Sequence, residues 1–353
     1  MLPGRWEPSH MNDPLQYMLH RLNPDIWRIS GNIAVRWYGL AYVAGFAAGF
    51  FILRHLALKG RLRLTLHQVE DLMIHLLIGV VIGARLGYVV FYEPSLLVSF
   101  SPAFPFWGLL EINRGGMSSH GGFLGVTVAV ILFARRAHLS WRNMGDAIVL
   151  AAPAGLFFGR AANFINGELY GRPADVPWAM CFPTEIFTWP SGKIAPLLAA
   201  LAAKGHIFTD LEHLIRVIRV NDDAARIIHG FLTPRHPSQI YEALLEGIAL
   251  FLILWVLHPR LKKDGQLTAI FFWSYAVLRI IAEQFREPDA AIGYQWLGLT
   301  RGQWLSMLFL IVGIIFWYVS QPPAHPASAG KNTSIHPKRG GRHGSRNSQT
   351  PSG

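Results

Sequence analysis

Cysteine and charge are both scarce in this sequence. Only 15% of its 353 residues are charged and one residue, Cys181, is a cysteine, whereas soluble domains carry charge on about a quarter of their residues. A single cysteine excludes an internal disulfide, a cysteine-rich zinc site and an iron–sulfur cluster. We interpret Cys181 as a small buried apolar residue rather than a nucleophile. With 52% hydrophobic residues and a mean hydropathy of +0.29, the composition predicts an integral membrane protein.

Acidic residues are also few, and the net charge is +11. The basic residues form short clusters between apolar runs, which is typical of loops beside anionic lipid headgroups, so we do not expect nucleic-acid binding. The N-terminal segment has no signal-peptide pattern, because polar residues such as Arg5 and Asp13 interrupt it. No cleavable signal is therefore expected.

Long apolar runs predict an all-α fold, a polytopic bundle of about seven transmembrane helices. A helix rises about 1.5 Å per residue, so about 20 residues cross a hydrocarbon core of ~30 Å. The candidate spans are Arg36–Leu56, Leu72–Phe91, Gly121–Ala134, Asp146–Gly167, Tyr241–Leu257, Leu267–Phe285 and Gln303–Val319. The sequence has no internal repeat of the kind that marks many transporters.

The basic loops predict the orientation of these spans. Arginine and lysine gather after the first, third, fifth and seventh spans, and these four segments lie on one side of the membrane if the spans number seven. The positive-inside rule makes that side cytoplasmic, with the N-terminus outside and the C-terminus inside.

The expected organisation has three parts. Residues 1–32 form an amphipathic lead-in on the membrane surface, residues 33–320 form the seven-span domain, and residues 321–353 form a disordered basic cytoplasmic tail. Within the second part, residues 169–239 form a small periplasmic cap with helical stretches at Ile194–Ala203 and Asp210–Ile228.

The stretch Gly159–Arg172 places polar groups at the end of an apolar run. Ionisable groups in hydrocarbon are costly and therefore usually functional. Counted along their spans, Arg160 and Arg279 reach similar depths in the outer half of the bilayer. Tyr275 and Glu283 share the face of Arg279 because they are four residues from it.

Other spans deliver polar groups to the same depth. These groups are Tyr38, Arg85, His120, Tyr241, Glu242 and Glu246. Structural alternatives remain: Arg85 can reach the membrane surface or pair with Glu242 or Glu246, and Tyr38 can belong to an aromatic belt. Glu283 can simply form a helix ion pair with Arg279. The glycines of the second span, Gly79, Gly83 and Gly87, are expected to form a close-packing face.

Two arginines at one depth suit bidentate binding of a phosphate, and a phosphate at outer-leaflet depth indicates a phospholipid headgroup. A nearby imidazole such as His120 can take a proton near neutral pH. The residues therefore predict an enzyme that acts on a phospholipid or a protein that binds one. A serine hydrolase using Ser118 or Ser119 lacks a Gly-x-Ser-x-Gly elbow, and a lipid or anion transporter is the remaining alternative.

Several motifs together resemble the bacterial phosphatidylglycerol–prolipoprotein diacylglyceryl transferase family. The motifs, in the family's order, are Arg36–Gly39, Ser119–Gly122, Gly159–Arg172, Arg235–Glu242, Arg279–Asp289 and Gly302–Ser306. The resemblance covers roughly residues 33–318 and implies a seven-span fold in the bacterial inner membrane with the active site toward the outer leaflet. It implies transfer of the diacylglyceryl group of phosphatidylglycerol to the lipobox cysteine of a prolipoprotein signal peptide. Neither a metal nor a cofactor is implied.

The resemblance also assigns roles. Arg160 and Arg279 would bind the phosphate and stabilise the leaving group, and His120 would be the base, with Tyr38, His236 or the phosphate itself as alternatives. The headgroup pocket would include Asn163, Glu168, Gly171, Tyr38 and His236, and Tyr275 and Glu283 would orient Arg279.

Two features depart from the family pattern. Ala161–Ala162 stands where a larger aliphatic residue and a glycine are usual. The segment from about Pro190 to Arg235 is longer than in many members, and we expect Asp210–Ile228 to form an added helix over the substrate entrance.

Overall fold

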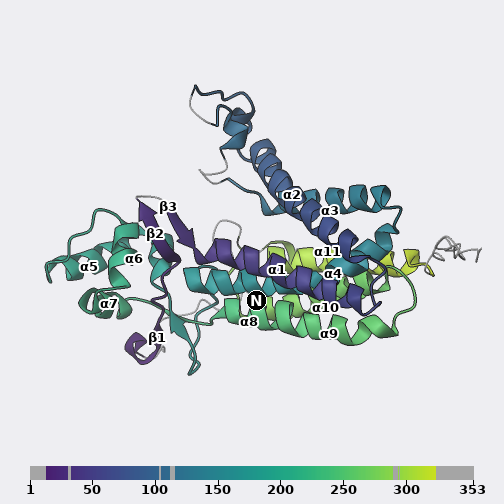
Figure 1. Cartoon of the computed structure of the whole chain (residues 1–353). Coiled ribbons are helices and arrows are strands. Elements are labelled where there is room, and N and C mark those ends of the chain that lie inside the picture. Colours follow the sequence, from purple (N-terminus) through teal and green to yellow (C-terminus); the bar gives the residue numbers. More distant parts are fainter. Residues whose placement is uncertain are drawn as a thin grey trace, which may run out of the picture. The chain divides into compact units, whose positions relative to one another are not determined.

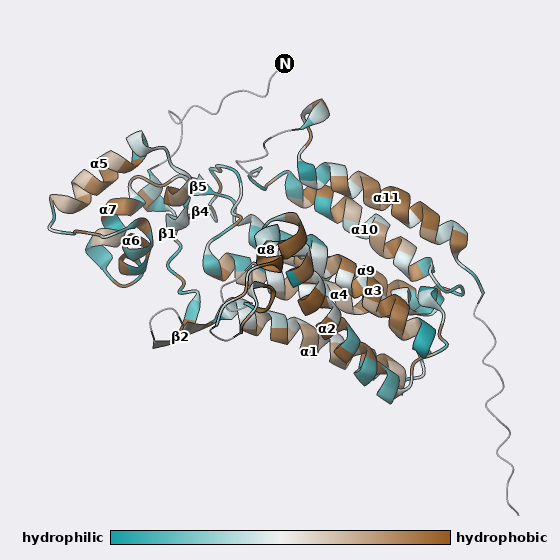
Figure 2. Cartoon of the chain, turned by 90° about the horizontal axis from the view of Figure 1, so that it is seen from above, coloured by the Kyte–Doolittle hydropathy of each residue, from teal (hydrophilic) through white to brown (hydrophobic). Residues whose placement is uncertain are grey.

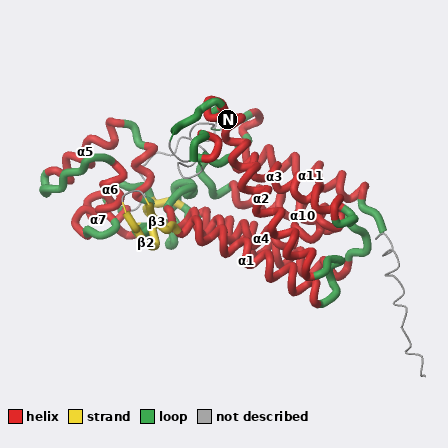
Figure 3. Tube along the Cα trace, turned by 45° about the horizontal axis from the view of Figure 1, so that its top comes forward, coloured by secondary structure: helices red, strands yellow, loops and turns green. Residues whose placement is uncertain are grey.

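A computed structural model describes residues 13–30, 33–102, 105–111, 116–288, 293 and 295–322 of the chain. The predicted tail lies outside the described residues except for Gln321 and Pro322. The described residues belong to one unit that ends at Pro322, and this unit is mostly helical (Figures 1 and 3).

Every predicted span is a helix in the structure. The long helices are α1 (Trp37–Leu58), α2 (Leu66–Phe91), α3 (Ser119–Arg136), α4 (Trp141–Asn166), α10 (Gln266–Glu283) and α11 (Arg301–Val319). One further helix combines α8 (Ser238–Glu242), a π-helical segment (Ala243–Ala249) and α9 (Leu250–Leu257). Short 3-10 helices cover Pro14–Gln16, Pro94–Leu97, Gly108–Leu110, Pro183–Thr188, His258–Arg260 and Trp296–Gly298.

Five of these helices are long and apolar enough to cross a membrane: α1, α2, α4, the combined helix Ser238–Arg260 and α11. Figure 2 shows that much of their length is hydrophobic, and the apolar side chains of Val43, Phe51 and Ile311 are each more than half exposed. Contiguous exposed apolar surface of this kind fits contact with lipid rather than water. The structure therefore confirms a polytopic helical protein, although α3 and α10 fall short of the same measure.

The helices pack mainly in pairs. The largest contacts join α1 with α4, α10 with α11, and α2 with α3 (Figure 1). Leu53, Leu72, Met144 and Leu150 are almost completely buried between α1, α2 and α4. The glycines of α2 form the predicted close-packing face, since a Cβ on Gly79 would lie 2.7 Å from the carbonyl oxygen of Gly125 on α3.

Residues between α4 and α8 form a helical region with its own buried cluster, and we refer to this region as the cap. It contains α5 (Ser191–Ala202), α6 (Leu211–Ile218) and α7 (Asp222–His229), which surround buried side chains that include Leu197, Leu214 and Ile228. The predicted helix over Asp210–Ile228 is thus two helices. Asn221 separates them because its side chain caps α7 by accepting from the backbone N–H groups of Asp223 and Ala224.

Two small sheets, which the all-α prediction did not include, connect the N-terminal segment to the rest of the fold. Strand β1 (Met18–Leu19) pairs with β4 (Met180–Cys181) of the cap, and β4 pairs with β5 (Pro234–Arg235). Strands β2 (Asp25–Ser30) and β3 (Ile33–Arg36) form a hairpin that runs into α1. The described part of residues 1–32 therefore pairs with later segments.

Candidate functional site

Four charged side chains from three helices meet inside the bundle. Arg160 of α4 and Arg279 of α10 both contact Glu242 of α8 and Glu246 of the π-helical segment. The shortest nitrogen–oxygen distances are 2.7 Å from Arg160 to Glu242 and 2.9 Å from Arg279 to Glu246. The two glutamates are buried, and the arginine side chains are only 17% and 10% exposed. The structure thus brings the two predicted phosphate ligands to one cluster.

The two glutamates hold the arginines without using all their hydrogen-bond donors. A guanidinium carries five N–H groups. Among the described residues, each arginine makes one hydrogen bond to Glu246, at 3.3 Å from Arg160 and 2.9 Å from Arg279. The carboxylate oxygens of Glu242 lie close to both arginines but do not meet hydrogen-bond geometry. The cluster therefore keeps both cations in place and leaves donors for an anionic ligand.

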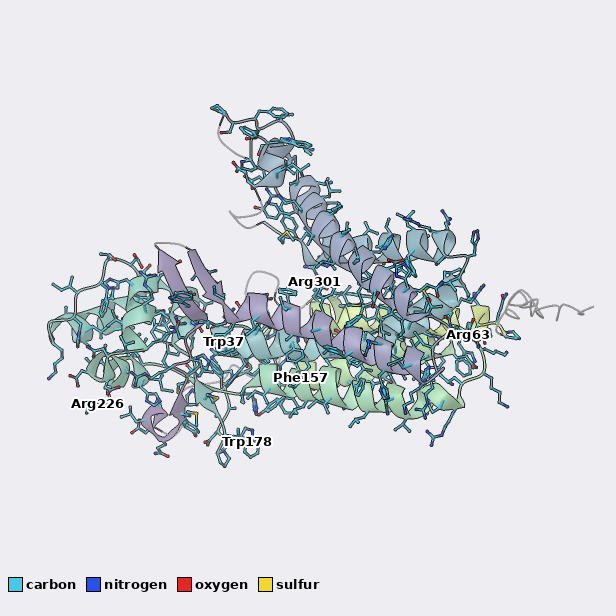
Figure 4. The ribbon with its side chains drawn as sticks, in the orientation of Figure 1. Trp37, Arg63, Phe157, Trp178, Arg226 and Arg301 are labelled. Atoms are coloured by element: carbon cyan, nitrogen blue, oxygen red, sulfur yellow. The ribbon has the colours of Figure 1, made fainter. Side chains whose placement is uncertain are left out.

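The π-helical segment is a feature that the sequence did not predict. It covers Ala243–Ala249 and carries Glu246, with Glu242 immediately before it. Here Gly247 packs against α4, because a Cβ at this position would lie 2.6 Å from the Cβ of Phe157, the residue labelled in Figure 4. π-helical turns are rare and are frequent at functional sites, and this one brings two carboxylates against Arg160.

Glu283 links the cluster to the start of α11. Its carboxylate lies 2.7 Å from Arg279 and accepts a hydrogen bond of 2.8 Å from the hydroxyl of Thr300. Gly302 permits this approach, since a Cβ there would lie 2.8 Å from the carboxylate. Thr300 was missed in the sequence, although the spacing of Thr300 and Gln303 is the signal of a capping box, which the structure contains.

The end of α4 forms a second group of polar contacts. Gly167 ends the helix in a left-handed conformation with φ of 70°, which glycine adopts without strain. Beyond it, Glu168 accepts a 2.8 Å hydrogen bond from Asn163, and its backbone carbonyl accepts one of 2.7 Å from Gln239. Gln239 belongs to the motif Arg235–Glu242, but the sequence alone did not predict this hydrogen bond.

Gly171 and His236 lie side by side. The Gly171 N–H donates to the His236 carbonyl at 2.9 Å, and a Cβ on Gly171 would lie 2.6 Å from that oxygen, so only glycine fits. The His236 ring is 3.2 Å from the hydroxyl of Tyr241, which also accepts from Trp178 at 2.6 Å (Figure 4). Burial lowers the pKa of the His236 imidazole below its ordinary value, so this ring is neutral at pH 7.

Three cavities adjoin these groups, and the smallest, of about 150 Å³, is lined by Arg279, Glu283 and Thr300. An apolar cavity of about 290 Å³ lies between α1, α2, α3 and α4 and is lined by Tyr38, Tyr42, Gly159 and Ala162. A larger cavity of about 770 Å³ is lined by polar residues that include Glu168, Arg235 and Arg286, and by Glu212 and Arg216 of α6. Arg286 also lies 3.8 Å from Glu242, so this residue both lines the larger cavity and adjoins the arginine cluster.

Two predicted residues remain to be placed. Tyr275 stacks on Phe271 and lies within electrostatic range of Arg279 and the rest of the arginine cluster. His120 is the second residue of α3 and is exposed, and none of the contacts of the described residues joins it to the arginine cluster. Its role as a base therefore stays a prediction.

Arg85 contacts the backbone of the loop between α2 and α3. It donates to the carbonyl oxygens of Gly108, Leu109 and Gly116 at 2.6 to 3.0 Å. Arg85 thus secures the loop between α2 and α3. Glu242 and Glu246 pair with Arg160 and Arg279 instead.

Comparisons with known proteins give one consistent result. Residues 24–319 match the family model described as prolipoprotein diacylglyceryl transferase. A protein named phosphatidylglycerol–prolipoprotein diacylglyceryl transferase from Bdellovibrio bacteriovorus is 40% identical over 86% of this chain and 94% of its own length. A protein of the same name from Rhodospirillum rubrum is 40% identical over 82% of this chain and 90% of its own.

Proposed function

The chain belongs to the prolipoprotein diacylglyceryl transferase family, and from this premise we propose how its site carries out the reaction. The reaction transfers the sn-1,2-diacylglyceryl group of phosphatidylglycerol to a prolipoprotein cysteine, the first step of lipoprotein maturation. The observation that carries the proposal is that Arg160 and Arg279 both contact the same two buried glutamates, Glu242 and Glu246.

The chemistry requires stabilisation of a leaving phosphate. The cysteine sulfur forms a bond to the glycerol carbon of the diacylglyceryl group, and the bond from that carbon to the phosphate oxygen breaks. The products are a thioether and glycerol 1-phosphate, and the thiol proton passes to a base. Negative charge therefore grows on the phosphate as the bond breaks.

Arg160 and Arg279 would bind this phosphate and offset the growing charge. In a site shielded from water, one preorganised donor of this kind contributes about 3 kcal/mol to the transition state. Glu242 and Glu246 keep the two guanidinium groups oriented before substrate arrives, and Glu283 with Thr300 fixes the outer side of Arg279. Such preorganisation avoids a reorganisation step during reaction.

The cavities suit the two ends of the lipid and the peptide. The apolar cavity lined by Tyr38 would take acyl chain, while Asn163, Glu168, Gly171 and His236 would line the headgroup side. The larger polar cavity would admit the prolipoprotein segment around the lipobox cysteine. Because Glu212 and Arg216 of α6 line this cavity, the cap would influence which prolipoproteins enter.

We assign the thiol base to His120, with His236 as the structural rival. A cysteine thiol is mostly protonated at neutral pH, because its unperturbed pKa is about 8.5, and needs an acceptor. His236 supplies a neutral imidazole beside Gly171. Transfer that stays near normal across pH in His120→Gln, together with loss in His236→Gln, would move the role to His236.

The membrane arrangement is part of the same proposal. We propose seven spans, adding α3 and α10 to the five that qualify by length and apolarity, with the N-terminus outside. This orientation places the arginine cluster toward the outer leaflet of the bacterial inner membrane and residues 169–239 in the periplasm. The tail at residues 321–353 would be disordered in the cytoplasm.

The test measures transfer of label to the cysteine of a lipobox peptide from phosphatidylglycerol that is labelled in its acyl chains. Arg160→Ala and Arg279→Ala should abolish transfer while the protein still inserts in the membrane. Arg226→Ala is a matched control, since Arg226 is an exposed arginine of the cap (Figure 4). Full transfer by either site variant would refute the phosphate-binding role.

A further inference from the structure

We propose a second anion site at the other end of the helices, where a cavity lined by basic loops binds a phosphate group. We call this region the loop end. It comprises Arg61 and Arg63 between α1 and α2, and Lys262 and Lys263 before α10, around a cavity of about 300 Å³. The arginine cluster of Arg160, Arg279, Glu242 and Glu246 is called the site end.

The two ends lie far apart along the same helices. Figure 4 shows Arg63 at the opposite end of α1 from Trp37. On α4, Asn143 lines the loop-end cavity and Arg160 belongs to the site end, and their separation along the helix is about 25 Å at 1.5 Å per residue. A ligand at the loop end is therefore distinct from the lipid proposed for the site end.

The carboxylates that line the loop-end cavity are already occupied. Asp146 accepts hydrogen bonds of 2.7 to 2.8 Å from the Gly265 N–H and from the N–H and hydroxyl of Thr268. Asp264 accepts from Arg63 at 2.8 and 3.1 Å. The four basic side chains Arg61, Arg63, Lys262 and Lys263 outnumber these two carboxylates in the lining, so the cavity keeps an excess of positive charge.

The loop that carries the two lysines is held in place. The side-chain oxygen of Gln266 accepts from the backbone N–H groups of Lys262 and Lys263 at 3.3 and 3.0 Å. The next residues pair with the end of α11, since Asp264 and Gln321 exchange backbone hydrogen bonds of 2.9 and 3.2 Å. The lysines are therefore presented from a fixed backbone, which lowers the entropic cost of binding.

The cavity also contains a polar atom without a partner. The side-chain oxygen of Asn143 is buried and has no hydrogen-bond partner among the described residues. It suits a hydroxyl donor, as carried by a protonated phosphate or by a polyol headgroup. A cation excess with one buried acceptor fits a phosphate-bearing ligand better than a simple halide.

The phosphate can come from a lipid headgroup or from free phosphate, and both offer the same chemistry. Basic residues at the ends of transmembrane helices meet lipid headgroups, and basic pockets between such helices bind anionic ones. The exposed Lys262 and Lys263 stand where the apolar helix Ser238–Arg260 ends.

Native mass spectrometry of the full-length protein in detergent, titrated with phosphatidic acid, tests the site. The double variant Lys262→Gln with Lys263→Gln should bind the lipid about thirtyfold more weakly, which corresponds to about 2 kcal/mol for two basic side chains. The matched control is Arg135→Gln with Arg136→Gln, which removes two basic residues at the end of α3 that do not line the cavity.

Each outcome decides the proposal. Weaker binding in the lysine variant with unchanged binding in the control supports the site. Competition by millimolar inorganic phosphate would then show that the phosphate group suffices, and no competition would show that the lipid form is needed. Equal binding by the wild type and the lysine variant, or an equal loss in the control, would overturn the proposal. Transfer activity in detergent should persist in the lysine variant. The outcome of this binding test is therefore independent of the phosphate-binding role proposed for Arg160 and Arg279.

Discussion

The site end and the loop end both bring arginine against carboxylate, but in different surroundings. At the site end the arginine side chains are at most 17% exposed and the contacted glutamates at most 5%. At the loop end Arg63 is 50% exposed while its partner Asp264 is 8% exposed. Water screens the second pair and hardly reaches the first. The same residue types therefore serve a preorganised site at one end and a hydrated charged surface at the other.

The largest expected difference between the ends is in stability. Glu246→Gln should lower the free energy of unfolding by about 3 kcal/mol, because a buried carboxylate that contacts both Arg160 and Arg279 becomes a neutral amide, and only Glu242 and Glu283 still face the two arginines. Asp264→Asn should lower it by about 1 kcal/mol, because Arg63 remains hydrated. Denaturant unfolding of both variants in one detergent gives the comparison. Equal losses would show that burial does not separate the two ends.

Activity should separate the ends almost as strongly. Arg279→Lys keeps the charge but removes the planar fork, so we expect transfer to fall about 100- to 1,000-fold. Arg63→Lys makes the same change at the loop end and should leave the rate within about twofold. Initial rates of transfer to a lipobox peptide measure both. A comparable fall in the Arg63 variant would mean that the loop end takes part in the reaction.

The sequence predicted which side chains meet at the site end, because depth follows from counting residues along a span. Arg160, Arg279 and the pair Glu242 and Glu246 were placed at one level for this reason, and the structure brings them together. Counting does not give rotation about the helix axis. Arg85 was counted to the same depth, but its side chain turns toward the loop before α3. Glu242 and Glu246, the alternative partners named for it, pair with Arg160 and Arg279.

Long-range pairings were the other part that the sequence could not supply. Strand β1 has only two residues and forms only because β4 lies beside it, so no local sequence pattern predicts it. The π-helical segment similarly depends on packing of Gly247 against Phe157. The predicted apolar runs are helices because a long apolar run in hydrocarbon must satisfy its own backbone hydrogen bonds, whereas these features depend on a neighbour distant in sequence.

Stability is expected to depend on pH through His20, whose ring packs on Phe164 near the end of α4 and on Phe182. Burial lowers the pKa of the His20 imidazole from 6.5 to about 4, although a hydrogen bond to the Phe164 backbone opposes this. Between pH 6.5 and about 4, the His20 imidazole is therefore protonated in the unfolded chain but neutral in the folded chain. Stability is complete above pH 6.5 and falls by about 3 kcal/mol as the pH drops to about 4.

The variant His20→Phe should flatten this pH dependence, since it keeps an aromatic ring and removes the titrating group. His67→Gln, which removes an exposed histidine on α2, should leave the slope as it is. Denaturant midpoints between pH 4 and pH 7 give the slope in each protein. A slope unchanged by His20→Phe would assign the acid sensitivity to other groups.

The smallest expected effect compares two capping boxes, one at each end. Thr65 caps α2 and Thr300 caps α11 with the same backbone contacts, but only Thr300 also donates to Glu283. Thr65→Ala and Thr300→Ala should each reduce stability by about 1 kcal/mol through loss of the cap. Only Thr300→Ala should also slow transfer, by about tenfold, because Glu283 loses a charge-assisted hydrogen bond and holds Arg279 less firmly.

Thr300→Ser separates positioning from stability, since serine keeps both the cap and the hydroxyl donor. It should restore the rate as well as the unfolding free energy. If Thr300 acts through Arg279, Thr300→Ala lowers the turnover number and leaves the Michaelis constant for phosphatidylglycerol unchanged. The bound lipid still contacts both arginines, but the charge that grows in the transition state is stabilised by a less well oriented Arg279. A loss of stability alone, matched by Thr65→Ala, would reduce Thr300 to a helix cap.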